Sequence, residues 1–127
     1  MTDRLLDTNI LILHFRNRPD VTALLTQWDT DGDLYISVAT RTEILAGMRS
    51  HEEKKTMALL SSINSLPIDK AIADKAGHLI NQYARQGVQL SFPDAQIAAT
   101  AIYHNLVLAT TNTKHFPMPE LNLQPFE

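Results

Sequence analysis

Apolar residues in this chain follow two patterns in turn, short continuous runs and longer stretches with helical spacing. Short runs bounded by turn-forming residues predict buried strands, whereas apolar residues at positions i, i+3, i+4 and i+7 predict helices with one buried face. The expected strands are residues 4–6, 34–38, 66–68 and 106–110, with at most one more near residues 121–126. The expected helices are residues 8–15, 20–28, 40–47, 52–65, 69–86 and 92–104.

The alternation of strands and helices predicts the architecture. Successive strand–helix–strand units form right-handed crossovers, which give a parallel sheet with helices on both faces. A chain of 127 residues is long enough for one domain with its own core and short for two. We therefore expect a single domain over residues 1–127. Its fold class is α/β, a three-layer α/β/α sandwich with a mostly parallel central sheet of four to five strands.

Composition narrows the class of protein. Hydrophobic residues make up 44% and charged residues 20%, as in ordinary globular domains. The chain has no cysteine, which excludes disulfides and thiolate metal sites and fits a reducing cytosol. No apolar stretch reaches the roughly 18 residues of a membrane span, and the N-terminus lacks a signal-peptide pattern. We therefore expect an intracellular, cytoplasmic protein with no membrane association.

The net charge limits how the chain could bind nucleic acid. At −3 it provides no general basic surface of the kind that attracts DNA or RNA. Any nucleic-acid role must then depend on local cations or on a bound metal ion.

Three carboxylates are expected at one edge of the sheet, where the strands end. Asp7 directly follows the first strand. Glu43 lies in the expected first turn of the helix after the second strand, and Asp94 lies in the expected first turn of the helix before the fourth strand. Ligands of α/β proteins bind at this edge, and carboxylates that converge there repel unless they share a cation. Oxygen ligands without sulfur suit Mg²⁺ or Mn²⁺, and such an ion would activate water for phosphodiester hydrolysis.

Taken one at a time, the same acids also have an ordinary structural explanation. The spacings Thr40-x-x-Glu43 and Ser91-x-x-Asp94 fit the capping box, in which the acid bonds the backbone at a helix start. Asp7 could equally be a helix N-cap or a strand-end residue. Independent caps have no reason to converge beside one sheet edge, so the joint placement favours a metal site.

Four segments together resemble a known family. They are LLDTNIL at residues 5–11, TEILAG at 42–47, PDAQIAATA at 93–101 and LATTN at 108–112. In this order they resemble the PIN-domain family, in particular the VapC toxins of bacterial toxin–antitoxin pairs, and the likeness covers nearly the whole chain. It implies an α/β/α sandwich and an endoribonuclease that depends on Mg²⁺ or Mn²⁺. It also implies inhibition by a cognate antitoxin protein bound across the active-site groove, and a homodimer.

The resemblance assigns a role to particular residues. Asp7, Glu43 and Asp94 match the three acids that hold the metal in that family. The chain departs from the family at Asn112, where many members have a fourth acid, and at His115, where another acid often stands. Asn112 can position a water molecule as part of the catalytic group but adds no charge, so the departure bears on a second metal ion more than on the first.

Other polar residues beside these segments are expected to support the site. Thr110 is expected to orient a carboxylate through its hydroxyl, and Thr8 to do the same beside Asp7. Arg41, Lys114 and His115 lie next to the family segments and are candidate contacts to RNA phosphates.

Two other functions are alternatives for the same residues, and the second fits them less well. A regulatory module that binds RNA or protein without effective catalysis would also lack the fourth acid. An aspartyl-phosphate phosphatase would need a second aspartate two residues after Asp7, and Asn9 stands there. No serine or cysteine nucleophile with a neighbouring histidine base is evident, so direct attack by water is the expected chemistry.

Overall fold

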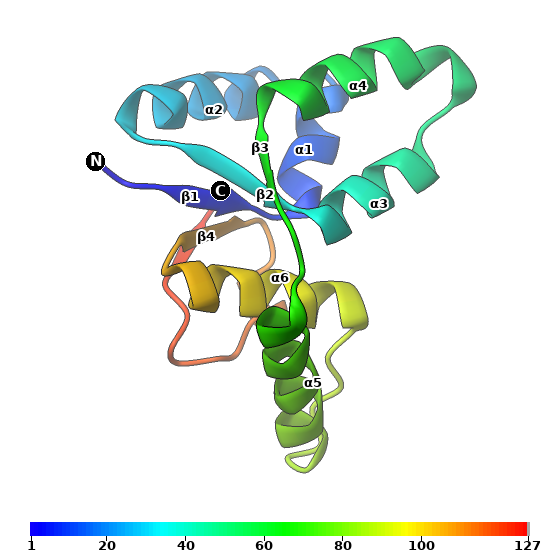
Figure 1. Ribbon diagram of the computed structural model, residues 1–127. Helices are drawn as coiled ribbons and strands as arrows, with labels where there is room; N and C mark the ends of the chain where they lie inside the picture. The colour runs from blue at the N-terminus through cyan, green and yellow to red at the C-terminus, as the bar shows by residue number, and fades with distance from the viewer. Residues whose placement is uncertain (127) are drawn as a thin grey trace.

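The computed structural model describes residues 1–126, which form one five-stranded sheet with helices on both faces (Figure 1). Every strand pair is parallel, and the strand order is β3-β2-β1-β4-β5. The strands are β1 (Arg4–Leu6), β2 (Leu34–Ser37), β3 (Asn64–Leu66), β4 (Val107–Thr110) and β5 (Leu123–Pro125). The expected parallel α/β/α sandwich is confirmed, and all five strands end at one common edge.

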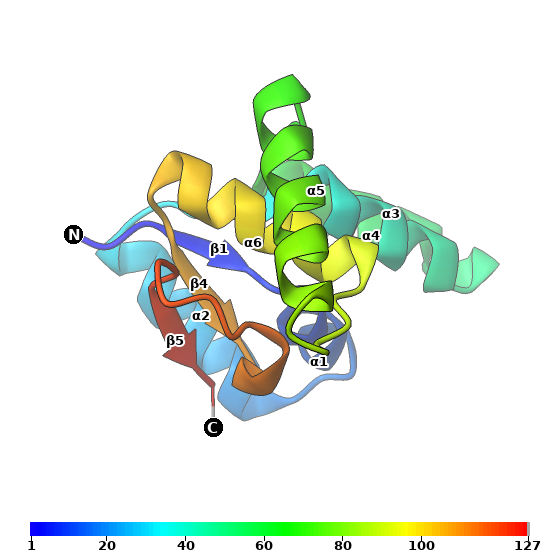
Figure 2. The same cartoon turned by 90° about the horizontal axis from the view of Figure 1, so that it is seen from below.

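The helices form two layers of unequal size. One layer holds α1, α2, α3 and α4, and the other holds α5 and α6, which Figure 2 shows from below. Their bounds are α1 (Thr8–Phe15), α2 (Pro19–Asp31), α3 (Val38–Gly47), α4 (Glu53–Ser62), α5 (Lys70–Ala84) and α6 (Phe92–His104). Two short 3-10 turns, η1 (Ser50–Glu52) and η2 (Thr113–His115), precede α4 and follow β4.

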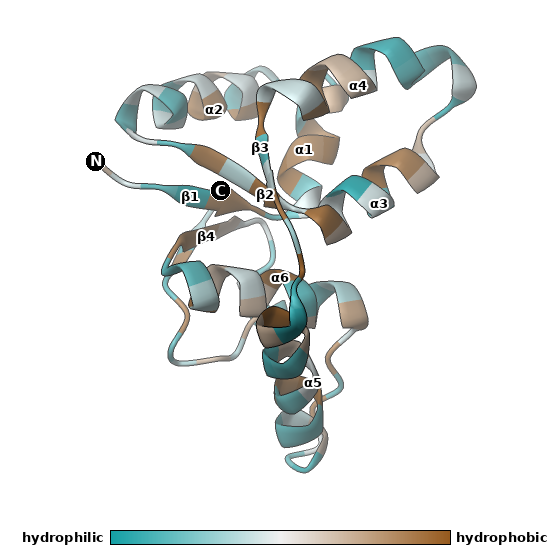
Figure 3. Ribbon diagram, in the orientation of Figure 1, coloured by the Kyte–Doolittle hydropathy of each residue, from teal (hydrophilic) through white to brown (hydrophobic). Residues whose placement is uncertain are grey.

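Successive strand residues supply the two faces of the core. Leu5 and Leu108 pack with α5 and α6, whereas Leu6 and Ala109 pack with the layer of α1 to α4. This is the alternation expected when each face of a parallel sheet is covered by helices. Figure 3 shows β4 as largely apolar and α5 as a mixture of hydrophobic and hydrophilic positions. Within residues 1–126, no helix has both the length and the apolar character required to cross a membrane.

Element boundaries differ from the sequence expectation at several places. Strand β3 comes before Pro67 instead of containing it, because proline has no N–H to donate to a neighbouring strand. Helix α2 starts at Pro19 and runs on to Asp31, beyond the end expected at residue 28. There Gly32 packs so closely on the chain start that a Cβ would collide with the carbonyl oxygen of Thr2.

One buried cation links β1 to two other elements. Arg4 is 7% exposed, and its Nε donates to Oε1 of Gln124 at 2.6 Å. Its Nη1 lies 3.1 Å from Oδ2 of Asp31, and the guanidinium lies over the ring of Trp28, 4.9 Å from the centroid. Arg4 therefore joins the first strand to α2 and to β5.

Candidate metal-dependent active site

Asp7 lies where β1 ends and α1 begins. Its backbone N–H donates to the carbonyl oxygen of Ala109 at 2.9 Å, which continues the pairing of β1 with β4. Its side chain is the N-cap of α1, because Oδ1 accepts from the backbone N–H of Thr8 at 2.8 Å. The expectation that Asp7 could be a helix N-cap is therefore confirmed.

The environment of Asp7 opposes its ionisation. The residue is 8% exposed, and burial is the main reason why the pKa of its carboxyl is raised above the ordinary value. Hydrogen bonds from Thr110 and Thr8 act in the opposite direction, the charge of Asp94 raises the pKa further, and His115 lowers it. A cation bound near Asp7 and Asp94 would therefore stabilise the ionised form of the Asp7 carboxyl.

Thr110, at the end of β4, holds the second oxygen of Asp7. Its hydroxyl donates to Oδ2 of Asp7 at 2.7 Å and accepts from the backbone N–H of Asn112 at 3.0 Å. Thr110 is fully buried, so both contacts are made away from solvent. The contact expected between Thr110 and a carboxylate is present.

Glu43 faces the site from α3, but not from the first turn of that helix. Helix α3 begins at Val38, and Ser37 caps it by accepting from the N–H of Ala39 at 3.0 Å. The expected capping box with Thr40 is therefore wrong, because the strand-to-helix junction lies three residues earlier.

The hydroxyl of Thr8 reaches Glu43 from the first turn of α1. Its Oγ1 lies 2.7 Å from Oε1 of Glu43 and 3.1 Å from Oγ1 of Thr40. Thr8 was expected to orient Asp7 with its hydroxyl, and instead orients Glu43. Its backbone N–H alone serves Asp7.

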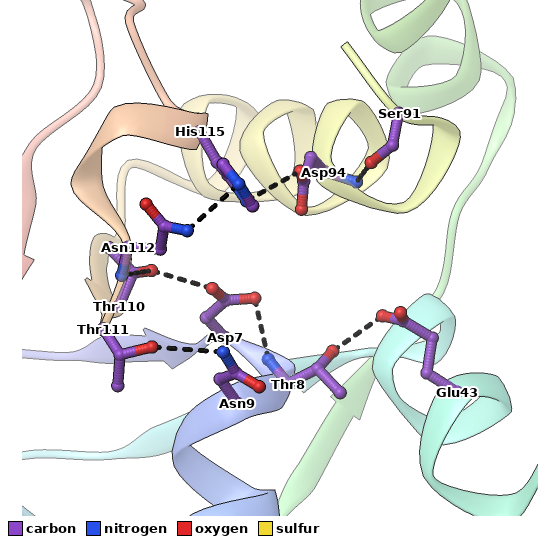
Figure 4. Close-up of polar contacts among 10 residues, drawn as sticks. All are labelled: Asp7, Thr8, Asn9, Glu43, Ser91, Asp94, Thr110, Thr111, Asn112 and His115. Carbon is purple, nitrogen blue, oxygen red and sulfur yellow. Dashed lines mark hydrogen bonds and ion pairs between the residues drawn. The ribbon is translucent and has the colours of Figure 1, made fainter. Parts of the chain in front are cut away.

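Asp94 lies in the first turn of α6. The Oγ of Ser91 accepts from its backbone N–H at 3.2 Å, so one half of the expected capping box is formed. The side chain of Asp94 turns away from that cap, and its Oδ2 lies 3.3 Å from Nδ1 of His115. Figure 4 shows Asp7, Glu43 and Asp94 facing a common space from three elements.

The turn after β4 closes this side of the site. Nδ2 of Asn112 lies 3.0 Å from Nε2 of His115, and Nδ2 of Asn9 donates to Oγ1 of Thr111 at 3.3 Å. The second contact ties the turn to α1. Sequence reasoning missed the Asn9–Thr111 contact and Thr40 beside Thr8, because these partners are far apart along the chain and no local pattern links them. It also missed the contact between Asn112 and His115, which lie in the same turn.

The comparisons with known proteins agree with the geometry. The PIN domain profile matches residues 4–119 of this chain. The chain belongs to the PIN-domain family. The resemblance read from the four sequence segments is therefore confirmed.

Relatives of this PIN domain span almost its full length. It is 38% identical over 122 residues to "Ribonuclease VapC10" of Mycobacterium tuberculosis, covering 96% of this chain and 92% of that protein. A chain of a toxin–antitoxin complex from Klebsiella pneumoniae is similar at a TM-score of 0.82 and 36% identity, with 98% of each chain covered. VapBC2 from Rickettsia felis, bound to a DNA fragment from its promoter, has a TM-score of 0.87 at 23% identity, which supports the fold alone.

The donor set of this PIN domain fits a hard divalent cation. Asp7, Glu43 and Asp94 offer only oxygen atoms, which suits Mg²⁺ or Mn²⁺. Within residues 1–126, no three His, Asp or Glu side chains are already gathered at chelating distance. Mg²⁺ does not require such a cage, because it keeps several waters and uses one or two carboxylates together with substrate phosphates.

The candidate RNA contacts differ in their surroundings. Nη1 of Arg41 lies 3.3 Å from the carbonyl oxygen of Leu60 and 3.2 Å from Oγ of Ser65, so it joins α3 to α4 and β3. That packing role explains Arg41 without RNA. Lys114 and His115 lie exposed in η2 beside the carboxylates.

Proposed function

We propose that this PIN domain is an endoribonuclease that requires Mg²⁺ or Mn²⁺ and acts as the toxin of a type II toxin–antitoxin pair. The proposal rests on the position of Asp7, Glu43 and Asp94, which face a common space from three elements at the carboxyl edge of the sheet in a member of this family. Relatives named as VapC ribonucleases, matched over nearly their full length, support the activity.

In this proposal the three carboxylates hold the ion, directly or through water. When bound, the ion supplies an activated water and neutralises charge that develops on the scissile phosphate. The protein keeps the carboxylates in place: Thr110 holds Asp7, and Thr8 holds Glu43. Asn112 presents its amide nitrogen to His115 and adds no charge to the site.

The partners follow from the same reasoning. RNA is the substrate, and a cognate antitoxin protein is the inhibitor, because similar structures are VapBC complexes. An apolar groove with two arginines lies beside Glu43, lined by Ile12, Phe15, Ile44, Arg16 and Arg49 among others, and offers a place for such a protein. We also propose that the protein is a homodimer and that it acts in the cytoplasm, a reducing compartment that suits a chain without cysteine.

The test compares Asp94→Asn with the unchanged protein on total tRNA and ribosomal RNA in Mg²⁺ or Mn²⁺. We expect cleavage by the unchanged protein that stops in EDTA. In the variant we expect a loss of about 100-fold or more, since even outer partners of a metal ligand contribute 10- to 100-fold. Asp74→Asn is the matched control, because Asp74 is an exposed acid on α5 and its loss changes the charge equally.

Two results would contradict the proposal. If Asp94→Asn cleaves RNA as the unchanged protein does, Asp94 is not part of the active site. RNA binding without turnover at any Mn²⁺ concentration would instead identify a non-catalytic module.

A further inference from the structure

The imidazole of His115 lies between an amide and a carboxylate that come from different parts of the chain. Nδ1 is 3.3 Å from Oδ2 of Asp94 on α6, and Nε2 is 3.0 Å from Nδ2 of Asn112 at the start of η2. Figure 4 shows the three side chains in a row above Asp7. Both ring nitrogens are thus engaged by the protein, although the side chain is 55% exposed.

Hydrogen bonds also link Asn112 to Asp7, the second acid at this edge of the sheet. The backbone N–H of Asn112 donates to Oγ1 of Thr110 at 3.0 Å, and that hydroxyl donates to Oδ2 of Asp7 at 2.7 Å. One short turn after β4 therefore contacts Asp94 directly, through His115, and reaches Asp7 through the hydroxyl of Thr110. The relative orientation of Asp7 and Asp94 depends on this turn.

Asp94 has few other means of orientation. Its side chain is 22% exposed, and Ser91 bonds its backbone and not its carboxylate. Among residues 1–126, His115 is the side chain that the structure records in polar contact with this carboxylate. A metal ligand with free side-chain rotation binds less tightly than one whose orientation is fixed by a neighbour.

We propose that His115 is a positioning residue that holds the Asp94 carboxylate for metal binding, and that Asn112 in turn holds the imidazole ring. This inference rests on the proposed function, because it assumes that Asp94 is a ligand. It assigns His115 to the metal site and not to the RNA phosphates. It also gives Asn112 a role that does not require the charge of a fourth acid.

Manganese affinity provides a test that is independent of RNA cleavage. Mn²⁺ binding to the full chain is measured by electron paramagnetic resonance for the unchanged protein, His115→Ala, His115→Asn and His115→Gln. An asparagine amide nitrogen can occupy the place of Nδ1, whereas glutamine reaches the place of Nε2. We expect the dissociation constant to rise about 10- to 100-fold in His115→Ala and His115→Gln, and His115→Asn to recover part of the loss.

The controls separate this inference from the proposed function. His78→Ala removes an exposed histidine on α5 and should leave Mn²⁺ affinity unchanged. Circular dichroism establishes that each variant is folded. If His115→Ala binds Mn²⁺ as the unchanged protein does, the inference is wrong while the proposed function stands. If the unchanged protein binds no Mn²⁺, both are wrong.

Discussion

Asp7 combines a structural and a chemical task in one side chain. One carboxylate oxygen caps α1 and the other accepts from Thr110, within a site where burial raises its pKa. A buried, ionised carboxylate without a cation is destabilising, because both hydrogen bonds together do not replace the water that it has lost. Burial therefore makes the ionised form of Asp7 less favourable in the metal-free protein.

Replacement of Asp7 by asparagine should stabilise the metal-free protein at neutral pH. The folded pKa of Asp7 is raised above 3.8, so its contribution to stability is fully present below that value and is lost as pH rises through the folded pKa. In EDTA at pH 7 we expect a higher Tm for Asp7→Asn than for the unchanged protein. The difference should shrink as pH falls below the folded pKa of Asp7, where the carboxyl is protonated.

Scanning calorimetry across this pH range measures the effect. Asp74→Asn on α5 makes the same charge change at an exposed position and serves as the reference. A lower Tm for Asp7→Asn at pH 7 would mean that the capping and Thr110 contacts need the full charge.

Sequence alone located the acids and the contact of Thr110 with a carboxylate, but not the contacts of Thr8 and His115. Asp7, Glu43 and Asp94 follow from strand ends and helix starts, which are local patterns. The contact between Asp94 and His115 could not be predicted, because the packing of η2 against α6 is set by tertiary structure. The hydroxyl of Thr8 was assigned to the wrong acid for the same reason.

At the scale of elements, β1 is central to the sheet and Arg4 anchors it at the edge opposite the site. The strand pairs with β2 on one side and β4 on the other, while Arg4 contacts Asp31 at the end of the long helix α2 and Gln124 on β5. Sequence predicted the order and type of these elements. It could not place their ends, because Gly32 and Pro67 act through contacts with distant backbone.

Arg4→Ala should destabilise the protein by about 2 kcal/mol, the range for losing a hydrogen bond made by a charged group. The side chain is 8% exposed, and its loss removes contacts to Asp31, Gln124 and Trp28. Arg18→Ala is the control, because Arg18 pairs with Asp20 on the surface and should contribute less than about 1 kcal/mol. Urea denaturation measures both. Equal losses would refute the anchoring role of Arg4.

At the scale of the whole molecule, the proposed metal site exists only in the folded chain. Its acids come from β1, α3 and α6, which are separated by dozens of residues. The unfolded chain cannot bring them together, so an ion that binds them stabilises the fold by mass action.

Saturating Mn²⁺ should therefore raise the free energy of unfolding by about 2.7 kcal/mol at 100 times the dissociation constant. Thermal denaturation with and without Mn²⁺ measures this shift. It should vanish in Asp94→Asn and persist in Asp74→Asn. An equal shift in both variants would place the ion elsewhere on the protein.

The N-cap at Asp7 also has an evolutionary consequence. The start of α1 requires an oxygen acceptor at this position, and asparagine caps a helix as well as aspartate does. A single base change converts an aspartate codon into an asparagine codon. One mutation can thus remove a charge from the site while the fold is kept. Descendants of this chain can lose activity and still be selected for binding their protein partners.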